Sequence, residues 1–149
     1  MNVAVIMGSA NDAPKMAPAL DVLTDFGVKA TQHVISAHRT PEAAASFARG
    51  ARDAGYGALI CGAGMAAHLA GVMAAHTTLP VVGVPLSGGA LNGVDALYAI
   101  VQMPRGVPVA TVAVDGAANA ALLAVEILAV SDPSLAGRLA EYRQAWGSP

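Results

Sequence analysis

The sequence predicts an α/β fold in which a five-stranded parallel sheet lies between two layers of helices. Five short apolar runs alternate with alanine-rich segments that carry apolar residues at helical spacing. The runs are continuously apolar rather than alternating, which is typical of parallel strands covered on both faces. Strands that alternate with helices build a doubly wound sheet, so we expect a three-layer, flavodoxin-like arrangement. The 149 residues fit a single domain, residues 1–149.

Each element follows from a local pattern. The five apolar runs predict strands at Val3–Met7, Ala30–Ile35, Ala58–Cys61, Val81–Val84 and Val109–Val114. The helices expected after them are Asp12–Phe26, Pro41–Ala54, Met65–Ala75, Asn92–Gln102 and Ala117–Val130.

Chemical signals mark several helix ends. Asn11 or Asp12 can cap the first helix, and Gly27 suits its C-terminal end. Thr40, which precedes a first-turn proline, is predicted to cap the second helix. Pro18 removes a backbone donor and predicts a tightened or kinked first helix.

A further helix, Pro133–Trp146, has no strand after it to cover. Its apolar residues fall at helical spacing and form one stripe, made of Leu135, Leu139, Tyr142 and Trp146. The pattern is equally compatible with packing on this domain and with packing on a neighbouring subunit.

The composition predicts a homo-oligomer. Charged residues make up 12% of the chain and hydrophobic residues 55%, whereas soluble domains average roughly 25% charged residues. A surface so poor in charge suggests burial between subunits. The net charge is −2 and no basic stripe is present, so nucleic acid is not expected as a partner.

Cysteine content and hydropathy argue against a disulfide-linked, secreted or membrane-spanning protein. Cys61 is the single cysteine, which excludes an internal disulfide and predicts a thiol packed as a small apolar residue at a strand end. No secretory signal is visible, so we expect a cytoplasmic protein. Residues 54–94 contain no charged side chain, but glycines, prolines and histidines interrupt them, which predicts buried core rather than a membrane span.

The end of the second predicted strand carries the strongest functional signal. Ser36, His38 and Arg39 follow an apolar run within four residues, and ligands bind at the carboxyl ends of parallel strands. Arginine suits a phosphate or carboxylate, and histidine moves protons near neutral pH. The sequence therefore predicts an enzyme that acts on a small anionic substrate.

The first strand also ends in polar residues. Gly8 permits close approach of the backbone to a ligand, and Ser9 offers a hydroxyl at the start of a helix, where anions are favoured. Asp12 can either cap the helix or accept hydrogen bonds from ribose hydroxyls. The segment is not a phosphate-binding Walker loop, because the Gly-Lys-Ser/Thr ending is missing.

The third strand leads into a glycine-rich turn with the spacing of a dinucleotide fingerprint, Gly62-Ala63-Gly64-Met65-Ala66-Ala67. We reject that interpretation, because the acid expected ~20 residues later is absent and the next acid is Asp95. The small residues instead allow a compact ligand to approach the backbone. His68 is either a second ligand contact or a structural residue at a helix start.

Two loops remain. The segment 85–91 is glycine-rich and predicted to cover a substrate, and Arg105 belongs either to an interface or to the site.

No histidine pair at metal spacing, carboxylate cluster or Gly-x-Ser-x-Gly elbow is present, so metal, glycosidase and serine-hydrolase mechanisms lack support.

Five ordered motifs resemble one family over almost the whole chain. They are Met7-Gly8-Ser9-x-x-Asp12, Ser36-Ala37-His38-Arg39-Thr40-Pro41, Gly62-Ala63-Gly64-x-Ala66-Ala67-His68-Leu69, Gln102-Met103-Pro104-Arg105-Gly106 and Asn119-Ala120-Ala121-Leu122-Leu123-Ala124. Together they resemble the 5-(carboxyamino)imidazole ribonucleotide mutases of purine biosynthesis.

The resemblance implies a flavodoxin-like homo-octamer that uses no metal and no organic cofactor. It implies that such an enzyme moves a carboxylate from the exocyclic nitrogen of the ribonucleotide to a ring carbon. It also implies a functional link to an ATP-dependent synthetase that makes the substrate.

Residue roles are likewise implied by the resemblance. His38 would shuttle the proton, and Ser9, Asp12 and Arg39 would bind the ribonucleotide, with Ser36 assisting at the phosphate. The loop that encloses the carboxylate or carbon dioxide would comprise Gly64, Ala66, Ala67, His68 and Leu69.

The chain departs from the family pattern in places, and Gly88-Gly89 makes the covering loop unusually bare. Met65 stands where the family typically has glycine, and Ala70 where it has proline; Met65 would narrow the carboxylate pocket. Two other functions remain open: an aminoimidazole ribonucleotide carboxylase that uses carbon dioxide directly, and a non-catalytic nucleotide-binding module. The sequence 66–69 resembles the mutase branch, so we expect the mutase.

Overall fold

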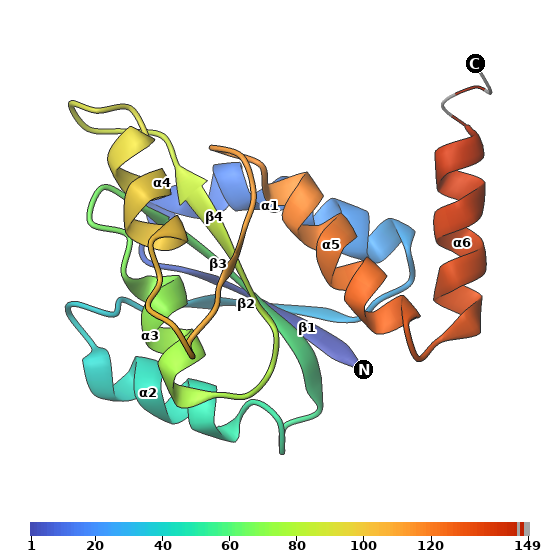
Figure 1. The fold of residues 1–149 in the computed structure, drawn as a ribbon, viewed down its shortest axis with the longest axis horizontal. Helices are drawn as coiled ribbons and strands as arrows, with labels where there is room; N and C mark the ends of the chain where they lie inside the picture. The colour runs from blue at the N-terminus through green and yellow to red at the C-terminus, as the bar shows by residue number, and fades with distance from the viewer. Residues whose placement is uncertain (146, 148–149) are drawn as a thin grey trace.

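The sheet has five parallel strands in the order β2-β1-β3-β4-β5 (Figure 1). This is the order of flavodoxin-like sheets, so the predicted fold class is confirmed. The computed structural model describes residues 1–145 and 147. Its strands are β1 (Asn2–Met7), β2 (Ala30–Val34), β3 (Tyr56–Gly64), β4 (Val81–Leu86) and β5 (Ala110–Thr111).

Helices cover both faces of the sheet. They are the short 3-10 helix η1 (Ala10–Asp12), then α1 (Ala13–Asp25), α2 (Pro41–Gly50), α3 (Leu69–His76), α4 (Val94–Val101), α5 (Ala117–Ala129) and α6 (Pro133–Gln144). Figure 1 shows α1 and α5 on one face and α2, α3 and α4 on the other. Alternate side chains of β1 enter the two cores: Val3 and Val5 pack with α1 and α5, whereas Ala4 and Ile6 pack with α2, α3 and α4.

The central strand β3 is longer than predicted at both ends, because it pairs with β1 on one side and β4 on the other. Glycines within it allow close helix packing: a Cβ at Gly62 would lie 2.3 Å from the Met16 sulfur of α1. The edge strand β5 is shorter than predicted, because only Ala110 and Thr111 pair with β4.

Helix α3 begins at Leu69, four residues later than predicted. Met65 has a φ of 49°, which is incompatible with a right-handed helix. Helix α2 ends at Gly50, earlier than the predicted Ala54. Helix α1 continues through Pro18 without ending there.

The edge strand β2 does not match the expected continuously buried strand. Its inner side chains face α2 in a polar and aromatic cluster, in which the Thr31 hydroxyl lies 2.8 Å from both His33 Nε2 and the Tyr56 hydroxyl. The rings of His33 and Phe47 lie 4.7 Å apart. Burial lowers the pKa of His33 below its ordinary value.

Helix α6 contacts its own domain at several points. Leu135 is buried against α1 and α5, and Tyr142 meets the Phe26 ring edge-on at 5.4 Å. Arg138 donates a hydrogen bond to the carbonyl of Phe26 over 2.7 Å. Trp146, the last residue of the predicted stripe, lies outside the described residues.

Two further expectations can be compared with the structure. Cys61 is fully buried within β3 rather than at a strand end, and burial raises the pKa of its thiol. None of the helices in the described part of the chain is both long and apolar enough to cross a membrane.

Candidate active site

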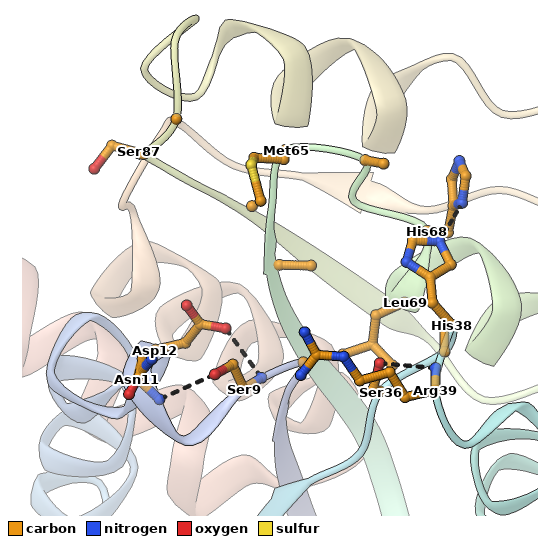
Figure 2. Close-up of a pocket in the computed structure, with 17 residues that line it drawn as sticks. Ser9, Asn11, Asp12, Ser36, His38, Arg39, Met65, His68, Leu69 and Ser87 are labelled. Atoms are coloured by element: carbon orange, nitrogen blue, oxygen red, sulfur yellow. Dashed lines mark hydrogen bonds between the residues drawn. The ribbon is translucent and has the colours of Figure 1, made fainter.

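A pocket of about 560 Å³ opens at the carboxyl ends of β1, β2, β3 and β4 (Figure 2). It lies where neighbouring crossovers from β1 and β3 leave the sheet on opposite faces, which is the usual ligand position in doubly wound folds. Its lining consists of Gly8, Ser9, Asn11, Asp12, Ser36, Ala37, His38, Arg39, Ala63, Gly64, Met65, Ala66, His68, Leu69, Ser87, Gly88 and Gly89.

The turn after β1 contributes Ser9 and Asp12. The Ser9 amide donates to the Asp12 carboxylate over 3.1 Å, and the Ser9 hydroxyl accepts from the Asn11 amide over 3.2 Å. Asp12 is the N-cap residue of α1, as predicted, but makes no side-chain cap hydrogen bond to it, and the Ser9 side chain caps η1. Burial raises the pKa of Asp12, and this outweighs the lowering effects of the Ser9 amide and Lys15.

The turn after β2 contributes Ser36, His38 and Arg39. The Ser36 hydroxyl accepts from the Arg39 amide over 3.1 Å, while the Thr40 hydroxyl donates to the Ser36 carbonyl over 2.9 Å. Thr40 is the N-cap residue of α2, as predicted, but its hydroxyl fixes this turn and makes no side-chain cap hydrogen bond to the helix. Figure 2 shows the Arg39 guanidinium extending across the pocket towards the Ser9 side.

The guanidinium of Arg39 remains available for a ligand. Within residues 1–145 and 147, no carboxylate lies within ion-pair distance of it. An exposed arginine without an acidic neighbour favours an anionic group that arrives with the substrate.

Two histidines meet at one side of the pocket. His38 Nε2 lies 2.7 Å from His68 Nδ1, and the two rings are almost perpendicular at 86° with centroids 4.9 Å apart (Figure 2). One N–H lies in this contact, which leaves His38 Nδ1 and His68 Nε2 free for other partners. The structure therefore brings His68 into the site as a neighbour of His38.

The turn after β3 forms the apolar part of the lining, through Gly64, Met65, Ala66 and Leu69. Ala67 is the exception among the residues assigned to this loop. It is fully buried beneath the turn, where its amide donates to the Met65 carbonyl over 2.9 Å, and it does not line the pocket. A tight turn of small residues places one of them in the core, which spacing alone did not reveal.

Two polar residues that the sequence analysis missed, Lys15 and Asp115, hold the loop after β4 through Ser87. Lys15 Nζ donates to the Ser87 hydroxyl over 2.6 Å, and the Ser87 amide donates to Asp115 over 2.9 Å. Asp115 also lies 3.8 Å from Lys15. Burial raises the pKa of Asp115, but the two Ser87 hydrogen bonds and the Lys15 charge outweigh it and lower the pKa overall.

A signal for this network existed in the sequence. Lys15, Ser87 and Asp115 come shortly after the ends of β1, β4 and β5, all of which meet at the same edge of the sheet. Arg105, whose role the sequence left open, is exposed and does not line the pocket.

Comparison with known proteins identifies the family. The family described as AIR carboxylase matches residues 2–147. This chain belongs to the AIR carboxylase family. The match includes every residue of the pocket lining, and the resemblance expected from the five motifs is confirmed.

Relatives within the AIR carboxylase family carry two names. The N5-carboxyaminoimidazole ribonucleotide mutase of Pyrococcus abyssi is 55% identical over 142 residues, which cover 95% of this chain and 82% of that protein. The mutase of Mycobacterium tuberculosis is 54% identical over 141 residues, covering 95% and 81%. The phosphoribosylaminoimidazole carboxylase of Saccharomyces cerevisiae is 51% identical over 94% of this chain but 24% of its own length.

A solved structure supports the AIR carboxylase fold. The crystal structure of Treponema denticola PurE superposes with a TM-score of 0.87 at 26% identity, covering 96% of this chain and 89% of that one.

Proposed function

We propose that this chain moves the carboxylate of 5-(carboxyamino)imidazole ribonucleotide from the exocyclic nitrogen to the ring carbon. The product is 5-amino-1-(5-phosphoribosyl)imidazole-4-carboxylate, a precursor in purine (IMP) biosynthesis. Relatives more than half identical over most of the chain carry the mutase name. The observation that carries the proposal is the His38–His68 pair at 2.7 Å, in one pocket with a free guanidinium and a wall of small apolar residues.

The polar side of the pocket suits a ribonucleotide. Arg39 binds the phosphate through two parallel N–H groups, and the Ser36 hydroxyl, which accepts from the Arg39 amide, keeps its own proton for a phosphate oxygen. One oxygen of Asp12 accepts the Ser9 amide, which leaves the other for ribose hydroxyls. The Ser9 hydroxyl adds a further polar contact.

The chemistry needs one group that first gives and later takes a proton. Protonation of the carbamate nitrogen by His38 breaks the C–N bond, leaves the electron pair on nitrogen and releases carbon dioxide. The electron-rich ring carbon attacks carbon dioxide to form the C–C bond, and His38 removes the ring proton. The steps are redox-neutral and balance without another reactant. In this scheme His68 positions His38 through their hydrogen bond.

The apolar wall serves the intermediate. Ala63, Ala66 and Leu69 offer carbon dioxide no hydrogen-bonding competitor and hold it near the ring carbon. Proximity of this kind replaces capture of dissolved carbon dioxide from solution. This is the physical difference between the mutase and a direct carboxylase.

We further propose that the protein works as a homo-oligomer, expected to be an octamer. Large apolar side chains remain exposed along one side of α4 and the turn before it: Leu91, Val94, Tyr98 and Val101. Their spacing of three or four residues makes a continuous stripe, consistent with the low charge of the chain. A stable monomer at micromolar concentration in sedimentation analysis would refute the oligomer.

The cellular setting follows from the substrate. Phosphorylated ribonucleotides do not cross membranes freely, so we place the activity in the cytoplasm. The carbamate must be supplied by an ATP-dependent synthetase, which makes that enzyme the expected functional partner.

A substrate comparison by proton NMR without ATP tests the function. One sample contains 5-(carboxyamino)imidazole ribonucleotide, and the other contains aminoimidazole ribonucleotide with modest carbon dioxide. Rapid conversion of the first alone supports the mutase. Efficient conversion of the second alone identifies a direct carboxylase, and turnover of neither leaves a nucleotide-binding module.

A further inference from the structure

We propose that Lys15 and Asp115 are positioning residues for substrate binding. They fix Ser87 and thereby hold the following glycine loop, Gly88 and Gly89, in the shape that receives the ribonucleotide. This inference rests on the proposed function, because that function assigns the ligand of the pocket. It is carried by the hydrogen bonds of Ser87, by the backbone of Asp115 and by the two bare glycines.

All the polar groups of Ser87 take part in this network. The Ser87 hydroxyl accepts from Lys15 Nζ over 2.6 Å and donates to the Asp115 carboxylate. The Ser87 amide donates to the same carboxylate over 2.9 Å, and the Ser87 carbonyl accepts from Lys15 Nζ. Because its one hydroxyl proton is already donated, Ser87 fixes the loop, and the donors offered to a ligand must come from the residues after it.

The turn that carries Asp115 is anchored independently of Ser87. Its φ of 57° lies in the left-handed region, which aspartate tolerates better than most residues with a Cβ. The Asp115 amide donates to the Pro85 carbonyl in β4 over 2.8 Å, and the Asp115 carbonyl accepts from the Ala117 amide of α5 over 3.0 Å. A rarely populated backbone conformation beside a pocket points to a functional constraint.

The loop after Ser87 has no side chains of its own to hold it. Gly88 and Gly89 line the pocket with φ values of 142° and 62°, and glycine loses more conformational freedom on ordering than any other residue. Within residues 1–145 and 147, neither glycine amide donates to another residue, so both can donate to ribose oxygens of the ligand. The shape of this loop therefore depends on the residue that precedes it.

The network lies on the Asp12 side of the pocket. Lys15 follows Asp12 by three residues, and its charge partly counteracts the burial that raises the pKa of Asp12. Figure 2 shows Ser87 and Asp12 on one side of the pocket and the histidine pair on the other. Lys15 thus connects the proposed ribose-binding carboxylate with the glycine loop, away from the groups that move protons. We therefore expect the network to control affinity and not the rate of the bound substrate.

A released loop must be ordered each time a ligand binds, and that cost appears in the Kd. Ordering one backbone residue corresponds to about a 5- to 30-fold change in an equilibrium constant. Lys15→Met and Asp115→Asn should each raise the Kd of the product by about this factor and leave kcat within about threefold. Asparagine tolerates positive φ but keeps one acceptor oxygen instead of two, so Asp115→Asn releases Ser87 without straining the turn.

Calorimetry with the product, together with turnover measured by NMR, tests this role. If both residues act through Ser87, the double variant should bind no more weakly than the weaker-binding single variant. The product without its phosphate should lose affinity by the same factor in Lys15→Met, because the lysine does not act on the phosphate. Lys29→Met and Asp53→Asn are the matched controls: they make the same charge changes at exposed positions outside the pocket and should keep the wild-type Kd.

Four results would overturn the proposal. Product affinity within about twofold of wild type in both single variants would refute the positioning role and leave the mutase standing. Weaker binding of the phosphorylated product alone in Lys15→Met would show that the lysine acts on the phosphate. Losses that multiply in the double variant would show that the two residues act separately. If the wild type neither turns over the carbamate nor binds the product, the proposed function fails and the role of the network falls with it.

Discussion

The histidine pair gives the most demanding prediction, because substitution of His38 and substitution of His68 should lower kcat by different amounts. If His38 carries the proton, His38→Asn removes general acid–base catalysis, which contributes about 10²- to 10⁴-fold to a rate. His68→Asn removes only the 2.7 Å hydrogen bond that orients His38. A typical hydrogen bond contributes about 1 kcal/mol net, and this corresponds to roughly a fivefold loss of kcat.

The double variant separates positioning from independent catalysis. If His68 acts through His38, then His38→Asn with His68→Asn should be no slower than His38→Asn alone, since the oriented group is already gone. Turnover is followed by NMR on the carbamate substrate, and binding of the product by calorimetry. Affinity should stay within about threefold in all three variants, because Arg39, Ser9 and Asp12 remain.

Two results would refute this reasoning. Retention of kcat within about threefold in His38→Asn would remove His38 as the proton carrier. Losses that multiply in the double variant would show that His68 acts on the substrate independently of His38.

Three further predictions concern binding, packing and pH. Arg39→Ala should raise the Kd of the phosphorylated product roughly 10- to 100-fold in calorimetry, since charge-assisted hydrogen bonds contribute about 1.5–3 kcal/mol, and should leave the phosphate-free riboside unaffected. Gly83→Ala places a Cβ 2.4 Å from Ile100 Cγ2 and should lower the free energy of unfolding by about 1–3 kcal/mol. Gly137→Ala, which has open space around it on α6, should raise the free energy of unfolding by about 0.5–1 kcal/mol. Equal melting temperatures for the two variants would contradict this expectation. The pKa of His33 is lowered in the fold, so its contribution to stability is complete above the ordinary histidine pKa of 6.5 and is lost as the pH falls below that value. Urea unfolding should therefore give a lower free energy of unfolding at about pH 5.5 than at about pH 7.5. His33→Gln should abolish this difference.

The element types were predictable because they depend on local patterns. Continuously apolar strands and alanine-rich helices predicted the doubly wound sheet, and the five strands appear where expected. Strand ends were less predictable, because they depend on neighbours: β3 is long since its pairing with β1 begins at Tyr56 and its pairing with β4 continues to Gly64, and β5 is short since only Ala110 and Thr111 pair with β4.

Part of the site was predictable because its residues follow directly on strand ends, which local patterns reveal. Ser9, His38 and Arg39 follow directly on strands, and the rule that ligands bind at carboxyl ends brings them together. Ala67 was misplaced because the turn of small residues has a buried side, and spacing does not show which residue occupies it. Lys15 and Asp115 were missed because their partner, Ser87, is 72 residues from one and 28 from the other.

The sequence by itself therefore determined the fold class, the family and most of the polar groups of the site, because these depend on residue type and local order along the chain. The tertiary structure decided how those groups meet: that His68 contacts His38, that α6 contacts its own domain, and that Lys15 and Asp115 both bond to Ser87. Such contacts join segments from different strands and helices. Their geometry depends on strand register and on the φ angles of single turn residues, which no local pattern specifies.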